Sequence, residues 1–283
     1  DYEGDFQWSA NLNLGTNKNE VLSLGGVASI TGGLFENENI SRVIVGEPMF
    51  YFYGYEMEGI FQDQTDIDGH ATQQNAEPGD VKFRDVAGAP DEAGNPTGPD
   101  GIIDSNDRTK IGNPFPDLTY GLSANFKYKG FDFNFFLMGV SGNDIYNTNI
   151  YDLQGMPRLF NSGVAVLDRW TGPGTSNTIP RALGAGENVS VSTRFVEDGS
   201  FTRLRNVSLG YTIPVNAFNN AISKLRVYIS GQNVFTITNY SGLDPEIGTH
   251  LTADNVDRNY ELGIDRGNFP MPKSFTAGVQ LTF

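Results

Sequence analysis

The stretch SFTAGVQLTF, residues 274–283, decides the fold of this chain. Apolar and polar residues alternate strictly along it, and its last residue is aromatic. Side chains of a β-strand point alternately to its two faces, so the stretch predicts a strand with one apolar and one polar face. An outer-membrane β-barrel ends in this way, but a soluble β-sandwich strand shows the same alternation. The rest of the chain has to discriminate between the two folds.

Five earlier segments carry the same alternation. They cover residues 6–15, 119–128, 131–140, 201–213 and 224–236. Each has roughly ten residues or more, the length that a tilted strand needs to cross the hydrocarbon layer of a bilayer. The 34 glycines, 20 phenylalanines and 12 tyrosines also favour aromatic strands joined by turns. We therefore predict an all-β chain with about six long strands.

The connections between these strands fall into two classes. Residues 129–130 and 214–223 are short links, whereas residues 16–118, 141–200 and 237–273 are long ones. In a meander, the short and the long links lie at opposite ends of the strands. Outer-membrane barrels have this asymmetry, with short periplasmic turns and long external loops. The pattern favours a large antiparallel transmembrane β-barrel over a sandwich, with acidic, glycine-rich loops that form a solvated extracellular rim.

Six strands are too few to close a barrel that carries such loops. We therefore expect residues 1–283 to be the carboxy-terminal portion of a larger barrel, with the earlier strands and any plug domain outside this chain. No signal peptide is visible at Asp1, which agrees with a processed chain or a part of a longer one. No run of about 18 apolar residues predicts a membrane helix.

Composition excludes several classes of function. The net charge of -15 and the pI near 4.4 argue against nucleic acid as a partner, because phosphate binding requires clustered Lys and Arg. The chain has no cysteine and only two histidines, His70 and His250, both in loop-like segments. No phosphate-binding glycine motif follows a predicted strand. We predict no catalytic residue and no enzymatic activity.

An aspartate-rich segment can be interpreted in two ways, as a calcium site or as an acidic turn. Asp100, Asp104 and Asp107 match positions 5, 9 and 12 of a calcium loop of the EF-hand kind, and Asp85 supplies position 1 only if residues 87–99 loop out. The four carboxylates then form a Ca²⁺ site. The alternative is an acidic turn whose side chains cap their own backbone. No other cofactor is required.

Aromatic and basic residues supply candidates for ligand binding. Tyr51, Tyr53 and Tyr55 belong to the densest aromatic segment, and Trp170 lies in a turn-like stretch. Aromatic faces bind sugars and peptides, but packing inside a folded loop explains the tyrosines as well, and Trp170 is first of all a turn anchor. Arg203 and Arg205, with Asn125 and Lys127, are candidates to face a ligand in the lumen. Inward polar residues also bond to one another, to water or to a plug.

Several motifs then occur in a fixed order. In chain order they are DGIID at 100–104, IGNPFPD at 111–117, FTRLRNVSLGY at 201–211, LRVYISGQNVF at 225–235, YSGLDPE at 240–246 and PMP at 270–272. With these motifs the chain resembles, over nearly its whole length, the carboxy-terminal region of SusC/RagA-family TonB-dependent transporters. It departs from that pattern at residues 87–99, an apparent insertion beside the predicted metal site.

This resemblance implies a barrel of about 22 strands with an amino-terminal plug, in the outer membrane of a Gram-negative bacterium. It implies active import of glycan or peptide oligomers, with TonB and a SusD-like lipoprotein lid as partners and outer-membrane lipid around the wall. It also implies that Phe283 marks the strand for barrel assembly. A passive porin or surface adhesin is the alternative, and a soluble calcium-dependent glycan-binding module is the second alternative.

Overall fold

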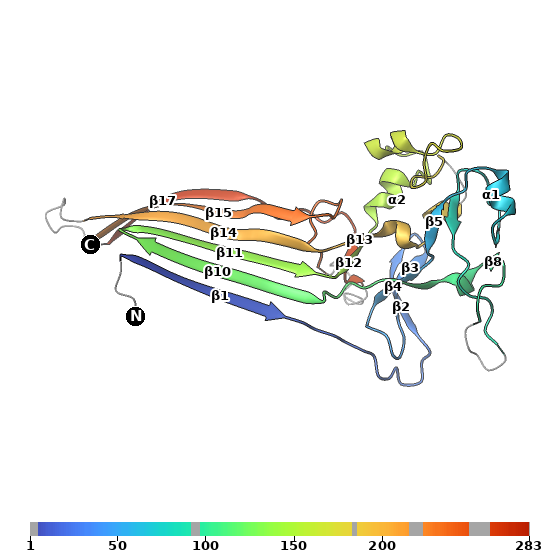
Figure 1. Ribbon diagram of the computed structural model, residues 1–283, viewed down its shortest axis with the longest axis horizontal. Coiled ribbons are helices and arrows are strands. Elements are labelled where there is room, and N and C mark those ends of the chain that lie inside the picture. The colour runs from blue at the N-terminus through green and yellow to red at the C-terminus, as the bar shows by residue number, and fades with distance from the viewer. Residues whose placement is uncertain (1–4, 92–96, 183–185, 215–222, 249–260, 283) are drawn as a thin grey trace.

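The computed structural model describes residues 5–91, 97–182, 186–214, 223–248 and 261–282, so His250 and Phe283 lie outside the described residues. Its largest element is a six-stranded sheet in which antiparallel strands follow one another in chain order (Figure 1). The strands are β1 (Phe6–Gly15), β10 (Leu118–Tyr128), β11 (Phe131–Ser141), β14 (Phe201–Ile213), β15 (Lys224–Thr238) and β17 (Ser274–Thr282). All six predicted strands are confirmed to within two residues at each end.

The register gives this sheet one apolar and one polar face. One row across the six strands consists of Trp8, Phe126, Phe133, Leu209, Ile229 and Ala277. The adjacent row consists of Ser9, Asn125, Asn134, Ser208, Ser230 and Thr276. Neighbouring rows point to opposite faces, so we call the side of the first row the apolar face and that of the second the polar face. Large side chains such as Trp8 are exposed on the apolar face.

A β-bulge keeps this alternation intact along β14. The register against β11 shifts between Phe136 and Leu137, which pair with Asn206 and Leu204, so Arg205 is an extra residue on β14. The shift keeps Leu204 on the apolar face with Val207, although three positions separate them. A strand without a bulge would turn one of these two side chains to the polar face.

The short and long connections lie at opposite ends of the sheet, as predicted (Figure 1). Lys129 and Gly130 join β10 to β11, and both have positive φ, 45° and 88°. Two consecutive left-handed residues are typical of the type I′ turn, whose twist matches that of a hairpin. The link from β14 to β15 lies mostly outside the described residues.

The three long connections fold together into what we call the loop lobe, which comprises the described residues of 16–117, 142–200 and 239–273. Its sheets are short. They contain β2 (Ile30–Phe35), β3 (Glu38–Val43), β4 (Tyr51–Gly54) and β9 (Thr109–Gly112); β12 (Asp144–Asn147), β13 (Val196–Asp198) and β16 (Ile264–Asp265); and the pairs β5 (Met57–Ile60) with β7 (Val81–Phe83) and β6 (Thr72–Gln73) with β8 (Ile102–Ile103).

Helical segments in the loop lobe are short as well. They are α1 (Gln64–Asp68), α2 (Asn149–Gln154) and the 3-10 turns η1 (Ser105–Asp107), η2 (Val164–Asp168), η3 (Gly186–Val189) and η4 (Thr193–Phe195). Among the described residues, no helix has the length and apolar character needed to span a membrane.

The loop lobe has a hydrophobic core of its own. Its buried members are Ile40, Phe52, Tyr146, Ile150, Val191, Phe195 and Ile264, which come from all three long connections. Burial of each large apolar side chain contributes roughly 1.5–3 kcal/mol. The loops that we expected to form a solvated rim therefore also have a packed interior, since residues up to about two hundred positions apart share one core.

Candidate functional site: the polar face of the sheet

The middle of the polar face is a hollow without charged side chains. Its volume is about 420 Å³. Its polar lining residues are Ser123, Asn125, Asn134, Asn206, Ser208, Ser230 and Gln232. Amides and hydroxyls both donate and accept hydrogen bonds, so this surface suits neutral polar groups such as peptide amides or sugar hydroxyls.

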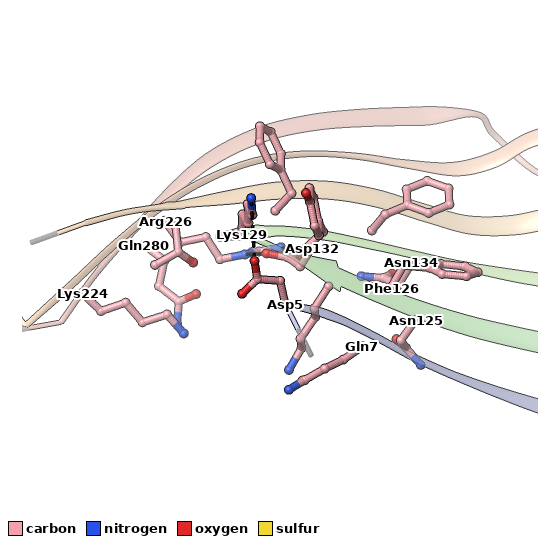
Figure 2. A pocket seen from close by; sticks show the side chains of 16 residues that line it. Asp5, Gln7, Asn125, Phe126, Lys129, Asp132, Asn134, Lys224, Arg226 and Gln280 are labelled. Carbon is pink, nitrogen blue, oxygen red and sulfur yellow. Dashed lines mark hydrogen bonds and ion pairs between the residues drawn. The ribbon is translucent and has the colours of Figure 1, made fainter. Parts of the chain in front are cut away.

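Towards the short-turn end, an ion pair spans three strands of the polar face. Arg226 on β15 donates from Nε and Nη2 to the two carboxylate oxygens of Asp132 on β11, at 2.8 and 2.5 Å (Figure 2). Gly210 on the intervening strand is the register partner of Asp132. A Cβ at Gly210 would lie 2.4 Å from Arg226 Nη2, so only glycine lets the guanidinium pass over β14 at this height.

More basic than acidic side chains gather around this pair. Lys129 lies 3.6 Å from Asp5, whereas Lys127 and Lys224 form no ion pair with any residue that the structure describes. Gln7 and Gln280 complete a hollow of about 590 Å³. Figure 2 shows Lys224, Gln280 and Arg226 at one end of it. We call Lys127, Lys224, Arg226, Gln7 and Gln280 the basic corner.

At the opposite, loop-lobe end, Arg203 is buried in an ionic network. Its side chain is only 2% exposed and donates to Thr236, to Asp244 at 2.5 Å and to Glu246 at 2.7 Å. Arg205 shares Glu246 at 2.8 Å. The structure thus brings the two predicted arginines together, and what they bind is the chain's own loop after β15.

Asp244 extends this network to the segment before the last strand. Besides Arg203 it accepts hydrogen bonds from the backbone N–H groups of Glu246 and Met271, both at 2.9 Å. Burial by itself raises the pKa of the Asp244 carboxyl, but these two N–H donors and Arg203 together hold that pKa below its ordinary value. The carboxylate therefore joins two loop segments to the wall.

The three predicted tyrosines lie together in the loop lobe, away from the polar face. Each ring has a cation over it. The pairs are Lys110 over Tyr51, Arg42 over Tyr53 and Arg108 over Tyr55, at 5.6, 4.4 and 5.8 Å from the ring centroids. Tyr51 is also buried, which raises its pKa to about 12. These contacts agree with packing of the aromatic segment inside a folded loop. Ligand binding by the tyrosines stays a prediction.

Trp170 packs against a second, smaller hydrophobic cluster in the loop lobe. Its ring packs with Tyr55 against the buried group of Ile60, Val81 and Phe83, and its backbone N–H donates to Ile179 at 2.9 Å. The indole Nε1 is buried and has no hydrogen-bond partner among the described residues. These contacts are those of a turn anchor.

The four predicted aspartates lie close together and receive backbone hydrogen bonds. Asp85 accepts from Gly101 at 2.7 Å, and Asp104 accepts from Asn106 at 2.7 Å. The fully buried Asp107 accepts from Val86, Ala87 and Asp104 at 2.7–3.1 Å. Within the described ranges, no group of three or more His, Asp or Glu has the geometry of a metal site. Calcium binding stays a prediction.

His70, the described one of the two histidines, has an ordinary loop environment. Its Nε2 lies 3.4 Å from the Glu58 carboxylate and its Nδ1 lies 3.0 Å from the carbonyl oxygen of Ala71. The ring packs edge-on against Phe61. These contacts hold the imidazole in place inside the lobe.

Comparison with known proteins gives consistent matches along the whole chain, although no family model matches. TonB-dependent receptor P3 of Formosa agariphila is 32% identical over 99% of this chain. TonB-dependent receptor SusC of Bacteroides thetaiotaomicron is 28% identical, also over 99%. The structure of the RagAB peptide importer in its closed-closed state superposes with a TM-score of 0.74 and 25% identity over 100% of this chain.

The fold therefore places the chain in one class of structure. It is part of the wall of a large antiparallel β-barrel, with its long connections at one end of the strands. Within that class, the chain is homologous over its whole length to TonB-dependent receptors of the SusC and RagA kind. It spans 27% of receptor P3, 25% of SusC and 28% of the RagAB chain. The predicted family resemblance and fold class are confirmed.

Proposed function

We propose that this chain forms part of the wall of an outer-membrane transporter that imports peptide or glycan oligomers with energy supplied through TonB. The observation that carries the proposal is the match of the entire chain to SusC and to a structure named as a peptide importer. The relatives are transporters and receptors, which agrees with a role in transport rather than catalysis. In this proposal residues 1–283 are the carboxy-terminal portion of the barrel, and a plug and a TonB-contacting segment belong to the remainder of a full-length protein.

The two faces of the sheet support this assignment. Exposed Trp8, Leu12, Phe275 and Val279 on the apolar face suit contact with lipid chains, and the neutral hollow on the polar face suits a lumen. Hydrogen-bonding side chains on the polar face offer cargo both donors and acceptors, for peptides and glycans alike.

The loop lobe then lies on the extracellular side. A SusD-like lipoprotein lid would contact this lobe, as the pairing in the name RagAB suggests for that importer. The lobe's own core makes it a rigid platform for such a partner.

Uptake in intact cells tests the proposal. Labelled peptide and glycan oligomers are offered to bacteria that carry the full-length receptor, with and without TonB. We expect uptake of one cargo class to need both the receptor and TonB. Undiminished uptake without TonB would instead favour a passive porin, and absence of the receptor from the outer-membrane fraction would contradict the membrane location.

A matched pair of variants tests which face lines the path. Ser208 and Leu209 are neighbours in β14 and point to opposite faces. Ser208→Trp fills the neutral hollow and should slow uptake several-fold, whereas Leu209→Trp adds the same ring to the apolar face and should leave uptake unchanged. Equal effects at equal receptor levels in the membrane would contradict a lumen on the polar face.

A further inference from the structure

The basic corner has a local charge opposite in sign to the net charge of the chain. The chain carries a net charge of -15, yet four cations and two carboxylates line this hollow, namely Lys127, Lys129, Lys224 and Arg226 with Asp5 and Asp132. Screening limits electrostatic interactions to about 8 Å at physiological salt, so the acidic loops at the far end do not cancel this local charge. An anion at the corner experiences a net positive surface.

Arg226 is held in place by its partner. Asp132 accepts from Nε and Nη2, which leaves Nη1 as the donor for a further acceptor. Lys127 is the register partner of Asp132, but both oxygens of that carboxylate already bind Arg226. Among the described residues, neither the Lys127 nor the Lys224 ammonium group lies within ion-pair distance of a carboxylate.

Amides complete the hydrogen-bonding surface. Gln7 is the register partner of Lys127, and Gln280 is that of Arg226. The hollow of about 590 Å³ has room for a few amino-acid side chains. Lysine ammonium groups, a guanidinium N–H and amide NH₂ groups are all donors, and carboxylates bind such donors strongly.

We propose that the basic corner binds the carboxylates of an acidic peptide segment, with Lys127 and Lys224, which form no ion pair within the described residues, as its cations and Arg226 as a fixed donor. The inference uses the proposed function only to place the polar face towards the lumen. Two sources share this chemistry. One is an acidic stretch in the remainder of the full-length polypeptide, and the other is an acidic peptide that passes through the lumen.

Photo-cross-linking in the purified full-length receptor tests the proposal. A photo-reactive phenylalanine analogue replaces Gln7, pentaglutamate is added as the probe, and mass spectrometry identifies what is captured. We expect either pentaglutamate or a Glu- and Asp-rich stretch of the same polypeptide. Capture of pentaglutamate identifies a passing peptide as the source, and capture of the internal stretch identifies the receptor's own chain.

The double variant K127Q/K224Q leaves the Arg226–Asp132 pair intact and removes the two lysine charges. Because an exposed ion pair has a modest effect, the yield of either acidic cross-link should fall about threefold to tenfold. K18Q/K273Q, which removes two exposed lysines elsewhere, should leave the yield unchanged. Equal capture of pentaglutamine and pentaglutamate, or an unchanged yield in K127Q/K224Q, would overturn the proposal. Both outcomes are readable in purified receptor, so they are independent of the TonB uptake test.

Discussion

Arg226 reaches Asp132 across a strand that lies between them, because Gly210 on that strand has no side chain. The pair links β11 to β15 without any backbone hydrogen bond between those two strands. Gly210→Ala places a methyl group 2.4 Å from the guanidinium and should displace it. We expect a loss of about 1–2 kcal/mol in the free energy of unfolding of the full-length receptor, as for a hydrogen-bonded charge pair.

A double-mutant cycle separates this ion pair from general effects of the added methyl group. In an Asp132→Asn background the pair is already weakened, so Gly210→Ala should have a clearly smaller effect there. Urea unfolding in detergent measures all four proteins. Additive effects of the two substitutions would show that Gly210 does not act through Arg226.

The buried guanidinium of Arg203 should be the main attachment of the loop after β15. Arg203→Met leaves Asp244 without its charged partner and Glu246 with Arg205 alone, and removal of one member of a buried ion pair costs about 3–5 kcal/mol. Hydrogen exchange of the backbone amides at residues 240–248 should then become much faster.

Arg205→Met is the matched control for that measurement. Arg205 is partly exposed and shares only Glu246, so its loss should cost at most about 1 kcal/mol. Similar exchange at residues 240–248 in both variants would contradict a special role for the buried arginine.

Attachment of the same loop should fail only in strong acid. The pKa of Asp244 is lowered in the folded protein, because its hydrogen bonds and Arg203 outweigh the effect of burial. Because the pKa of Asp244 is lower in the folded protein, its carboxylate stabilises the fold at pH values above its ordinary pKa of about 3.9. This stabilisation is lost as the pH falls through the lower pKa of the folded state. Hydrogen exchange at residues 240–248, corrected for its intrinsic pH dependence, should be constant from about pH 8 to 5 and rise below about pH 4. A rise between pH 8 and 6 would show that another group controls the loop.

Asp107 should stabilise the loop lobe with or without calcium. Asp107→Ala removes the acceptor of three backbone N–H groups and should cost about 2–4 kcal/mol. Asp100→Ala, which removes an exposed acceptor of one N–H group, should cost far less.

The calcium hypothesis makes a different prediction, a rise in Tm of the receptor at millimolar calcium that Asp107→Ala abolishes. Calorimetric titration with calcium distinguishes the two.

Strand periodicity was enough to predict the wall of the barrel. Ten-residue strands such as β1 repeat the alternation five times, so their faces and limits follow from residue types alone. β16 has only two residues and pairs with β12, more than a hundred positions away. So short a strand has no detectable period, and its partner is fixed by the shared core around Ile264.

Prediction of the site was limited for a similar reason. Strict alternation from Leu209 would put Arg203 on the apolar face, and only the bulge at Arg205 turns it to the polar face. Its partners Asp244 and Glu246 lie in an irregular loop more than 40 positions further on. Asp132 and Arg226 are 94 positions apart and meet only through the register of three strands. Gly210, in the middle of a strand of larger residues, is the one local signal for that close approach.

The core shared by the three long connections has a consequence for how such receptors can change. Ile40, Tyr146 and Ile264 come from three different loops and pack in one cluster, so a new side chain in one loop must fit surfaces supplied by the other two. Exchange of a single loop with a relative would leave a cavity or a clash in this cluster. The three loops should therefore be transferable between barrels only as a set, and diversity should accumulate on their outward surface, where substitutions remain independent.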